Sequence, residues 1–213
     1  AIARSSSSFS GVLYDRYILG VWVKAEGLIY PMFDQLKHTF TDESAPQSGI
    51  YYISLDYGTM NPCAAHLWCV SGQVAYCMAE FYYDGRDTGR PLTDEEYLTH
   101  VLALAGKFPV VRYIIDPSAA SFIQCMRRRG IPVSKANNDV VSGISNTASA
   151  LEYGRVRFHE GCKNTIREFG LYAWDEKAAD DKPIKDNDHA MDSVRYFVRT
   201  ILNKQFFMFD KRF

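Results

Sequence analysis

The chain has 213 residues, of which 47% are hydrophobic and 14% aromatic, so it can build one substantial core and is not a disordered chain. Its 24 basic and 25 acidic side chains leave a net charge of −1, without the basic excess typical of a protein that binds DNA unaided. No apolar run approaches the roughly 20 residues of a membrane-spanning helix, so we expect no membrane partner.

Five cysteines stand at positions 63, 69, 77, 125 and 162. They form neither a Cys-x-x-Cys pair nor a Cys/His cluster with zinc spacing. Their odd number and the apolar neighbours of Cys69 and Cys77 indicate reduced thiols, as in cytosolic proteins. We therefore expect no zinc site.

Composition predicts three parts. Residues 1–11 contain a serine run and are expected to be a disordered end or a remnant of cloning. Residues 12–49 are aromatic-rich, broken by glycines and Pro31, and end in a polar, turn-forming run, which indicates an arm or linker. Residues 50–213 are expected to form a single domain.

This domain begins with the pattern of an antiparallel meander. The expected strands are residues 50–56, 64–70 and 73–83. Ser71 and Gly72 form a tight hairpin signal between the last two strands. After a charged loop, Thr93 and Glu96 have the spacing of a capping box, which predicts a helix to about residue 105.

Strands and helices alternate after residue 110. The expected strands are 111–116, 131–135 and 155–158, and the expected helices are 118–129, 140–152, 162–171 and 189–202. Short links between them indicate parallel βα units. The sequence therefore predicts an α/β fold with a mixed sheet of five or more strands, three antiparallel and then parallel, and helices on both faces. This element order is that of the ribonuclease-H-like fold.

Three aspartates stand at the ends of these elements. Asp56 ends the first strand, Asp116 ends the first parallel strand, and Asp192 lies one turn into the last helix with His189 on the same face. Neighbouring strands would bring Asp56 and Asp116 close, and a crossing helix could deliver Asp192. Clustered carboxylates repel each other unless a cation neutralises them, and Mg²⁺ or Mn²⁺ suits such oxygen ligands. Two such ions would clamp a phosphodiester for hydrolysis.

Each of these residues also has an ordinary structural interpretation. Asp56 before Tyr57-Gly58 fits a turn residue, and Asp116 before Pro117 fits a helix cap. Asp192 fits the helix dipole, and His189 fits a cap or a surface position. The metal-site hypothesis therefore depends on the combination of residues.

Three segments resemble the nuclease motifs of the phage terminase large subunit: YYISLDYGTMNPCAA (51–65), YIIDPSAASF (113–122) and DHAMDSVRYFV (188–198). Residues 16–33 also resemble the stretch that joins the ATPase and nuclease domains of that family. The resemblance implies a ribonuclease-H-like nuclease that cuts concatemeric double-stranded viral DNA by two-metal-ion hydrolysis during genome packaging.

The resemblance also implies the roles of individual residues and the binding partners. Asp56, Asp116 and Asp192 would bind two Mg²⁺ or Mn²⁺ ions and be catalytic, with His189 as a further ligand or a group beside the ligands. The polar loop 175–188 would lie next to the site and gate DNA access. The implied partners are double-stranded DNA, an ATPase domain, the small terminase subunit and the portal protein, in the host cytoplasm and not in the mature virion. No G-x-x-x-x-G-K-[ST] motif occurs here, so the ATPase is not in this sequence.

Six basic residues are candidate contacts for DNA phosphates, although a solvated basic face would explain them equally well. They are Arg127, Arg128, Arg129, Lys135, Arg155 and Arg157.

Three other functions compete with this one. The run LDYGTMNPCAA is similar to the first phosphate loop of actin-like and Hsp70-like ATPases, but DPSAAS lacks the glycines of their second loop, and 213 residues leave no room for two lobes. Another ribonuclease-H-like nuclease, such as a resolvase or integrase, would share the acids but not the arm. A docking or DNA-binding module that had lost its metals would have no need of the three acids.

Overall fold

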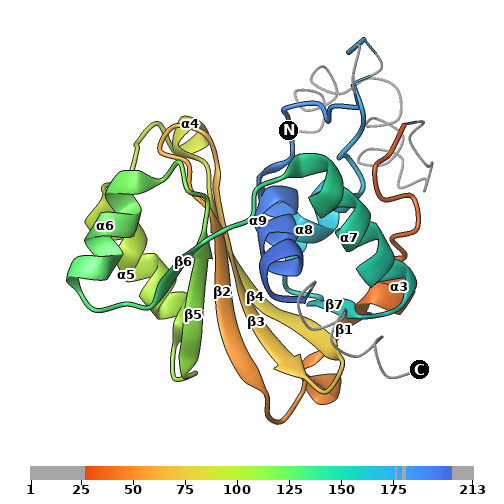
Figure 1. Cartoon of the computed structure of the whole chain (residues 1–213), viewed down its shortest axis with the longest axis horizontal. Helices are drawn as coiled ribbons and strands as arrows, with labels where there is room; N and C mark the ends of the chain where they lie inside the picture. The colour runs from red at the N-terminus through yellow and green to blue at the C-terminus, as the bar shows by residue number, and fades with distance from the viewer. Residues whose placement is uncertain (1–26, 176, 179–180, 203–213) are drawn as a thin grey trace, which may run out of the picture.

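A seven-stranded mixed sheet forms the centre of the computed structural model, which describes residues 27–175, 177–178 and 181–202 (Figure 1). The strand order is β1-β7-β4-β3-β2-β5-β6. The strands are β1 (Thr39–Phe40), β2 (Ile50–Asp56), β3 (Cys63–Ser71), β4 (Val74–Tyr83), β5 (Val110–Ile115), β6 (Val133–Lys135) and β7 (Val156–His159).

The strand pairing follows from the lengths of the connections. The short hairpin at Ser71↔Val74 makes β3 and β4 antiparallel, and β2 pairs antiparallel with the other edge of β3. Helical crossovers then make β5 parallel to β2, β6 parallel to β5, and β7 parallel to β4. The predicted α/β fold, with an antiparallel meander followed by parallel units, is confirmed.

Helices cover both faces of the sheet, with α5 and α6 on one face and α7, α8 and α9 on the other (Figure 1). Their bounds are α5 (Asp94–Ala105), α6 (Ala120–Arg128), α7 (Val140–Glu152), α8 (Lys163–Phe169) and α9 (His189–Phe197). A π-helical turn, η3 (Val198–Leu202), continues α9. The shorter elements are α3 (Gln35–His38), η2 (Asp42–Ser44) and α4 (Gly85–Thr88).

Strand β3 contributes side chains to two hydrophobic cores, one on each face of the sheet. Because successive side chains point to opposite faces, Ala65 and Leu67 pack under α5 and α6, whereas His66 and Trp68 face α8 and α9. All nine residues of β3 except Ser71 are buried, as expected of a strand covered on both faces.

Part of the stretch before residue 50 packs on this body, through buried residues between positions 29 and 40. Tyr30 is 1% exposed, and its ring contacts those of Phe169 and Tyr172. Strand β1 adds to the sheet beside β7. Residues 29–40 of the expected arm therefore lie against the domain that was expected to begin at residue 50. The expected extension 1–11 and residues 12–26 of the aromatic arm fall outside the described residues.

Two further expectations can be compared with the structure. All five cysteines are free thiols. Across the described parts of the chain, no helix is long and apolar enough to cross a membrane.

Candidate active site

The ends of β2 and β5 set two of the three aspartates side by side. These strands are parallel neighbours, with Leu55 opposite Ile115, so Asp56 and Asp116 follow at the same edge of the sheet. Helix α9 packs across β2, β3 and β5 on one face and carries His189 and Asp192. Three segments far apart in sequence therefore meet at one edge.

A tight loop after β2 fixes the direction of the chain beyond Asp56. A Cβ atom at Gly58 would lie 2.4 Å from the carbonyl oxygen of Asn61 and 2.6 Å from that of Pro62. Only glycine fits such a close approach between backbone segments. The D-Y-G sequence thus lets the chain turn back into β3 directly after the aspartate.

Asp56 is paired with His189. The His189 Nδ1 atom lies 2.9 Å from Asp56 Oδ2. Burial raises the pKa of Asp56 to about 6, against the hydrogen bond from His189, which lowers it. Burial lowers the pKa of His189, but the hydrogen bond and charge of Asp56 outweigh burial and raise it. One hydrogen bond thus joins a buried carboxylate to an imidazole whose pKa that carboxylate raises.

Asp116 is held by three donors. The backbone N–H of Ser118 donates to Oδ1 at 2.7 Å, and the Tyr196 hydroxyl and Asn138 amide donate to Oδ2 at 2.8 Å and 3.4 Å. Burial would raise the pKa of Asp116, but these hydrogen bonds outweigh it, so the pKa lies below its ordinary value. Asp116 is therefore ionised in conditions where Asp56 begins to take up a proton.

Tyr196 connects the two carboxylates. Its hydroxyl lies 2.8 Å from Asp116 Oδ2 and 3.5 Å from Asp56 Oδ1. The ring stands on α9, one turn beyond Asp192. The same helix thus supplies an acid and the phenol that orients two other acids.

Asp192 is held by two cations. The buried Arg195 guanidinium donates to Asp192 Oδ1 at 2.8 Å, and the Lys185 ammonium lies 3.7 Å from Oδ2. Arg195 also donates to the carbonyl oxygens of Asn138 and Asp139, which fixes the guanidinium from the far side. A Cβ atom at Gly143 would lie 2.4 Å from Arg195 Cγ, so glycine makes room for this side chain.

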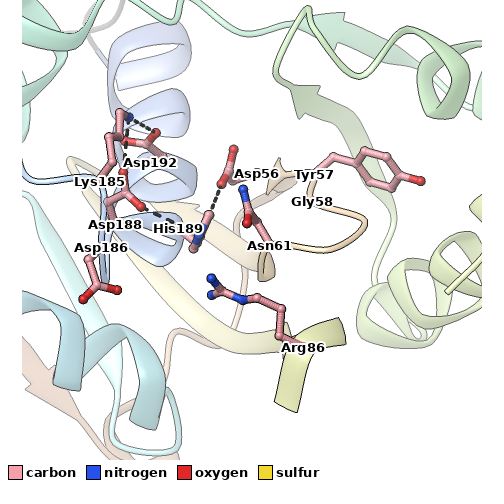
Figure 2. A pocket seen from close by; sticks show the side chains of 10 residues that line it. All are labelled: Asp56, Tyr57, Gly58, Asn61, Arg86, Lys185, Asp186, Asp188, His189 and Asp192. Atoms are coloured by element: carbon pink, nitrogen blue, oxygen red, sulfur yellow. Dashed lines mark hydrogen bonds and ion pairs between the residues drawn. The ribbon is translucent and has the colours of Figure 1, made fainter. Parts of the chain in front are cut away.

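A hollow of about 280 Å³ opens over these groups (Figure 2). It is lined by Asp56, Tyr57, Gly58, Asn61, Arg86, Lys185, Asp186, Asp188, His189 and Asp192. Asp116 does not line it and joins the site through Tyr196. The structure therefore brings Asp56, His189 and Asp192 into one cavity, with Asp116 beside it.

The donor set fits a hard divalent cation, because carboxylate oxygens dominate the hollow. Within the described residues, however, no three His, Cys, Asp or Glu side chains stand together in a ready metal-binding arrangement. Each of these carboxylates instead has a partner within the protein: Arg195 and Lys185 pair with Asp192, and the His189 ring contacts Asp56. The carboxylates are compensated in pairs instead of converging on a single point.

Sequence patterns do not single out four other charged residues of this hollow, which are Arg86, Lys185, Asp186 and Asp188. Asp188 is 4% exposed, and its carboxylate lies 3.2 Å from the Lys185 ammonium and 3.8 Å from His189 Nε2. Both Asp188 and Lys185 come from the polar loop 175–188, where acids and lysines alternate and no spacing marks the functional ones. Arg195 and Tyr196 lie in the segment DHAMDSVRYFV (188–198), and the resemblance of that segment to a terminase nuclease motif is the sequence signal for them.

The six basic candidates are spread over the molecule. Lys135 pairs with Ile115 in the sheet and lies at the same edge as Asp116. Arg155 and Arg157 lie at the opposite end of the sheet from Asp56. They flank Val156, which pairs with Ala75 at the start of β4. Asp56 pairs with Ala64 of β3, which in turn pairs with Tyr82 near the end of β4. Seven residues along β4 correspond to roughly 23 Å.

The arginine run is also distant from the acids. Helix α6 begins close to Asp116 and runs away from it toward the start of β6. Arg127 and Arg128 form the last turn of this helix, and Arg129 is its C-cap residue. Arg129 pairs with Glu95 of α5. Of the six candidates, the structure therefore places only Lys135 at the edge that carries the acids.

Comparison with known proteins identifies the family. A model described as the terminase RNaseH-like domain matches residues 72–200. The large terminase of a thermophilic bacteriophage, in complex with ADP, is 45% identical, covering 94% of this chain and 51% of that chain, with a TM-score of 0.80. None of the curated proteins matches.

Two nuclease domains share the fold at lower identity. The P22 large terminase nuclease domain is 20% identical, with 90% of this chain and 100% of that chain covered and a TM-score of 0.68. The nuclease domain of the bacteriophage SPP1 large terminase with bound Mn is also 20% identical, with 75% and 92% covered and a TM-score of 0.57. This chain spans about half the length of the ADP-bound large terminase. Because the family model covers more than half of the 213 residues, the chain belongs to the terminase RNaseH-like domain family.

Proposed function

We propose that this domain is a divalent-metal-dependent endonuclease that cuts double-stranded viral DNA during genome packaging. The observation that carries the proposal is the hollow in which Asp56, His189 and Asp192 meet, with Asp116 joined to Asp56 through Tyr196. The Mn-bound SPP1 nuclease domain, which has the same fold, supports the choice of cation class.

Asp56, Asp116 and Asp192 would hold the cations, two in number, with His189 and Asp188 as further candidates. Bound Mg²⁺ or Mn²⁺ would supply an activated water and stabilise the charge that develops on the phosphodiester. The raised pKa of Asp56, caused first by burial, supports this role, because a cation would remove the cost of ionising a buried carboxylate.

The chain's own residues would orient these ligands. Tyr196 keeps Asp116 and Asp56 in a fixed relation, and Arg195 holds one oxygen of Asp192 so that the other faces the hollow. His189 can hold a proton at Nδ1 against Asp56, or release it when Asp56 ligates a cation. These contacts arrange the carboxylates before a ligand arrives, which lowers the ordering cost of binding.

DNA affinity would come mostly from outside this domain. The net charge of −1 provides little phosphate neutralisation, and Lys135 is the only one of the six basic candidates at the acidic edge. An attached ATPase domain, the small terminase subunit and the portal protein would hold the DNA and time the cut. Lys185, Asp186 and Asp188, at the end of the loop 175–188, line the hollow, which supports a role of this loop in controlling access of DNA.

Cleavage of supercoiled plasmid tests the proposal. The purified chain at high concentration should nick and linearise plasmid with Mn²⁺ or Mg²⁺, show little sequence preference, and stop on addition of a chelator. Asp56→Asn, Asp116→Asn and Asp192→Asn should each remove cutting, beyond the roughly 10–100-fold loss typical of residues that only support ligands.

The same variants separate a metal site from a structural role. Asp192→Asn is left out of this comparison, because it removes the counter-charge of the buried Arg195 guanidinium and lowers stability in either case. If Asp56 serves as a ligand, Asp56→Asn should keep the melting temperature of the metal-free chain or raise it, because it removes a buried carboxylate that Asp192 and Asp188 repel. A large loss of stability would favour the interpretation as turn and cap residues. The proposal is wrong if plasmid stays intact with Mn²⁺ both for this chain and for a longer chain that includes the ATPase domain.

A further inference from the structure

The N-terminus of α9 lacks a cap from its own chain segment. The first amide groups of a helix have no partner inside the helix, and a side chain at the N-cap position usually accepts from them. Asp188 stands at that position but makes no side-chain capping hydrogen bond. Its carboxylate faces Lys185 and His189. The leading amides of α9 must therefore be satisfied from elsewhere.

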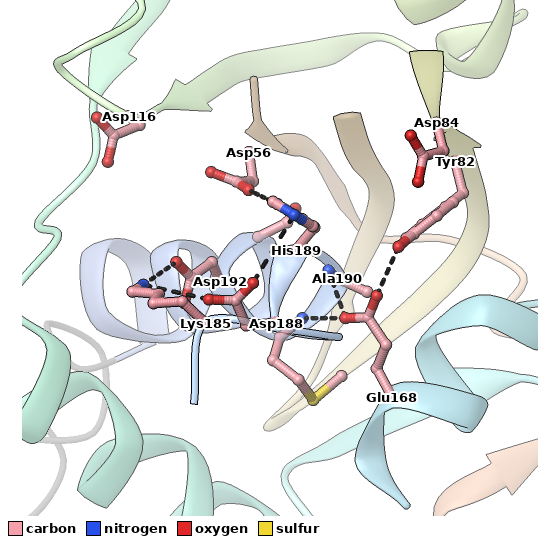
Figure 3. A network of polar contacts seen from close by, with 12 residues as sticks. Asp56, Tyr82, Asp84, Asp116, Glu168, Lys185, Asp188, His189, Ala190 and Asp192 are labelled. Atoms are coloured by element: carbon pink, nitrogen blue, oxygen red, sulfur yellow. Dashed lines mark hydrogen bonds and ion pairs between the residues drawn. The ribbon is translucent and has the colours of Figure 1, made fainter. Parts of the chain in front are cut away.

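Glu168 supplies the missing acceptor from another helix (Figure 3). Its Oε2 atom accepts from the backbone N–H of Ala190 at 2.8 Å and of Met191 at 3.3 Å. Glu168 lies in the last turn of α8 and is 0% exposed. A fully buried carboxylate is costly unless it is hydrogen-bonded, and here its partners are the two amides.

The other oxygen of Glu168 ties the cap to the sheet. The Tyr82 hydroxyl on β4 donates to Oε1 at 2.8 Å. Helix α8 is itself anchored at its start, because the Glu80 carboxylate accepts from the backbone N–H groups of Asn164 and Thr165 at 2.7 Å and 2.9 Å. The acceptor that caps α9 is thus fixed to β4 at both ends of α8.

We propose that Glu168 is a positioning residue that caps α9 from outside and so holds His189 and Asp192 in the arrangement that binds a divalent cation. This inference rests on the proposed nuclease function. The two capped amides, at residues 190 and 191, lie between these two site residues in the first turn of α9. A shift of that turn would move both side chains, and metal ligands tolerate displacements of only about 0.5 Å.

Mn²⁺ affinity of the whole chain in the absence of DNA tests this inference, read by the electron paramagnetic resonance signal of free Mn²⁺. Glu168→Met has similar size but accepts no hydrogen bond, and it should weaken Mn²⁺ binding by about 10–100-fold, as loss of supporting contacts does at other metal sites. Glu168→Gln retains an acceptor for the amides and should stay within about twofold of the original chain.

Plasmid cutting provides a second readout. For Glu168→Met, the Mn²⁺ concentration for half-maximal cutting should rise by the same factor, while saturating Mn²⁺ restores most of the rate. Asp34→Ala serves as a control, because Asp34 caps α3 at the far edge of the sheet. It should lower the melting temperature without changing Mn²⁺ affinity.

Several results would overturn the inference. If Glu168→Met folds and binds Mn²⁺ with unchanged affinity, Glu168 has only a structural role. If Glu168→Gln loses as much Mn²⁺ affinity as Glu168→Met, the charge of Glu168 matters and not its capping of α9. If Glu168→Met does not fold, Tyr82→Phe takes its place, because it removes one hydrogen bond to Glu168. A severalfold loss of Mn²⁺ affinity in Tyr82→Phe supports the inference, and an unchanged Mn²⁺ affinity rejects it. Failure of the original chain to bind Mn²⁺ or to cut DNA would instead reject the proposed function.

Discussion

The two faces of the sheet are built on different physical principles. Under α5 and α6 the core is almost entirely apolar, with residues such as Leu98 and Met126 fully buried. Under α7, α8 and α9 an apolar cluster surrounds buried polar groups, among them His66, Glu168 and Arg195. Both faces are buried, but among the described residues side-chain hydrogen bonds between a helix and a strand are found only on the second face, at residues such as His66 and Tyr82. On the first face, Tyr57 just after β2 donates to Asp94 at the start of α5.

This difference follows the location of the acids. Apolar contacts are non-directional, so α5 and α6 can adjust slightly without losing much free energy. Hydrogen bonds have narrow distance and angle preferences, and a missed partner in a low-dielectric core is costly. The face that carries Asp192 and His189 therefore uses the interactions that fix a helix in one position.

The sharpest test is the same substitution on both faces. Met126→Ala on α6 and Met191→Ala on α9 each empty a site that is 0% exposed. Each should lower the free energy of unfolding by about 2–5 kcal/mol, measured by urea denaturation. Only Met191→Ala should also weaken Mn²⁺ binding, because it loosens the first turn of α9. Equal Mn²⁺ affinities in the two variants would contradict the division between the faces.

The buried carboxylate of Glu168 gives the polar face a pH dependence. Burial raises the pKa of Glu168 from 4.5 to about 7, although hydrogen bonds from Tyr82 and the α9 amides and the charge of Arg167 lower it. Between these two pH values the folded chain keeps a proton that the unfolded chain has released. Stability contributed by this group therefore falls as pH rises from about 4.5 to 7, by an amount of the order of 3 kcal/mol.

Urea denaturation of the metal-free chain across this pH range checks the effect. Glu168→Gln should remove this part of the slope, and the difference between the two curves isolates Glu168 from other groups nearby such as His189. Two parallel curves would mean that Glu168 titrates in the folded chain as it does in the unfolded one.

A smaller effect is expected from a hydroxyl within the polar network. Ser193 on α9 lies 2.8 Å from His66 Nδ1 and 3.0 Å from the Ser54 hydroxyl. Ser193→Ala leaves both partners buried with a lost contact, so we expect a loss of about 1–3 kcal/mol in urea denaturation. Thr99→Ala removes an exposed hydroxyl from α5 and should cost much less. Similar losses in both variants would argue against a directed network.

Most of the fold could be predicted because its signals are local. The strand at 50–56 and the helix at 140–152 are observed with the expected bounds, since alternation and helical periodicity are written in adjacent residues. Strand β1 was not predicted, because two residues carry no period. The last helical run spans the expected residues 189–202, but its final five residues, Val198–Leu202, widen into the π-helical turn η3, which the sequence does not indicate.

The site was predictable only in part, for a related reason. Asp56 and Asp116 could be placed at one edge because parallel neighbouring strands end together. The partners of Glu168 and Lys185 could not be predicted, because their contacts depend on the position of a whole helix or loop. The arginines at 127–129 form a conspicuous run, yet a run of charge does not reveal which end of the sheet it occupies.

Lys185 allows the finest test of the comparison, because it lies at the exposed margin of the polar face. Its ammonium is 3.2 Å from Asp188 and 3.7 Å from Asp192, and the charges of these acids outweigh burial and raise its pKa. A fixed positive charge there repels an incoming cation, so Lys185→Met should tighten Mn²⁺ binding. The side chain is 67% exposed, and solvent screening limits the expected gain to about fivefold. Lys107→Met removes the same charge just beyond the C-terminal end of α5 and should leave Mn²⁺ affinity unchanged. Weaker binding in Lys185→Met would show that this lysine orders the acids more than it competes with the cation, and would extend the directed network of the polar face to the loop at its margin.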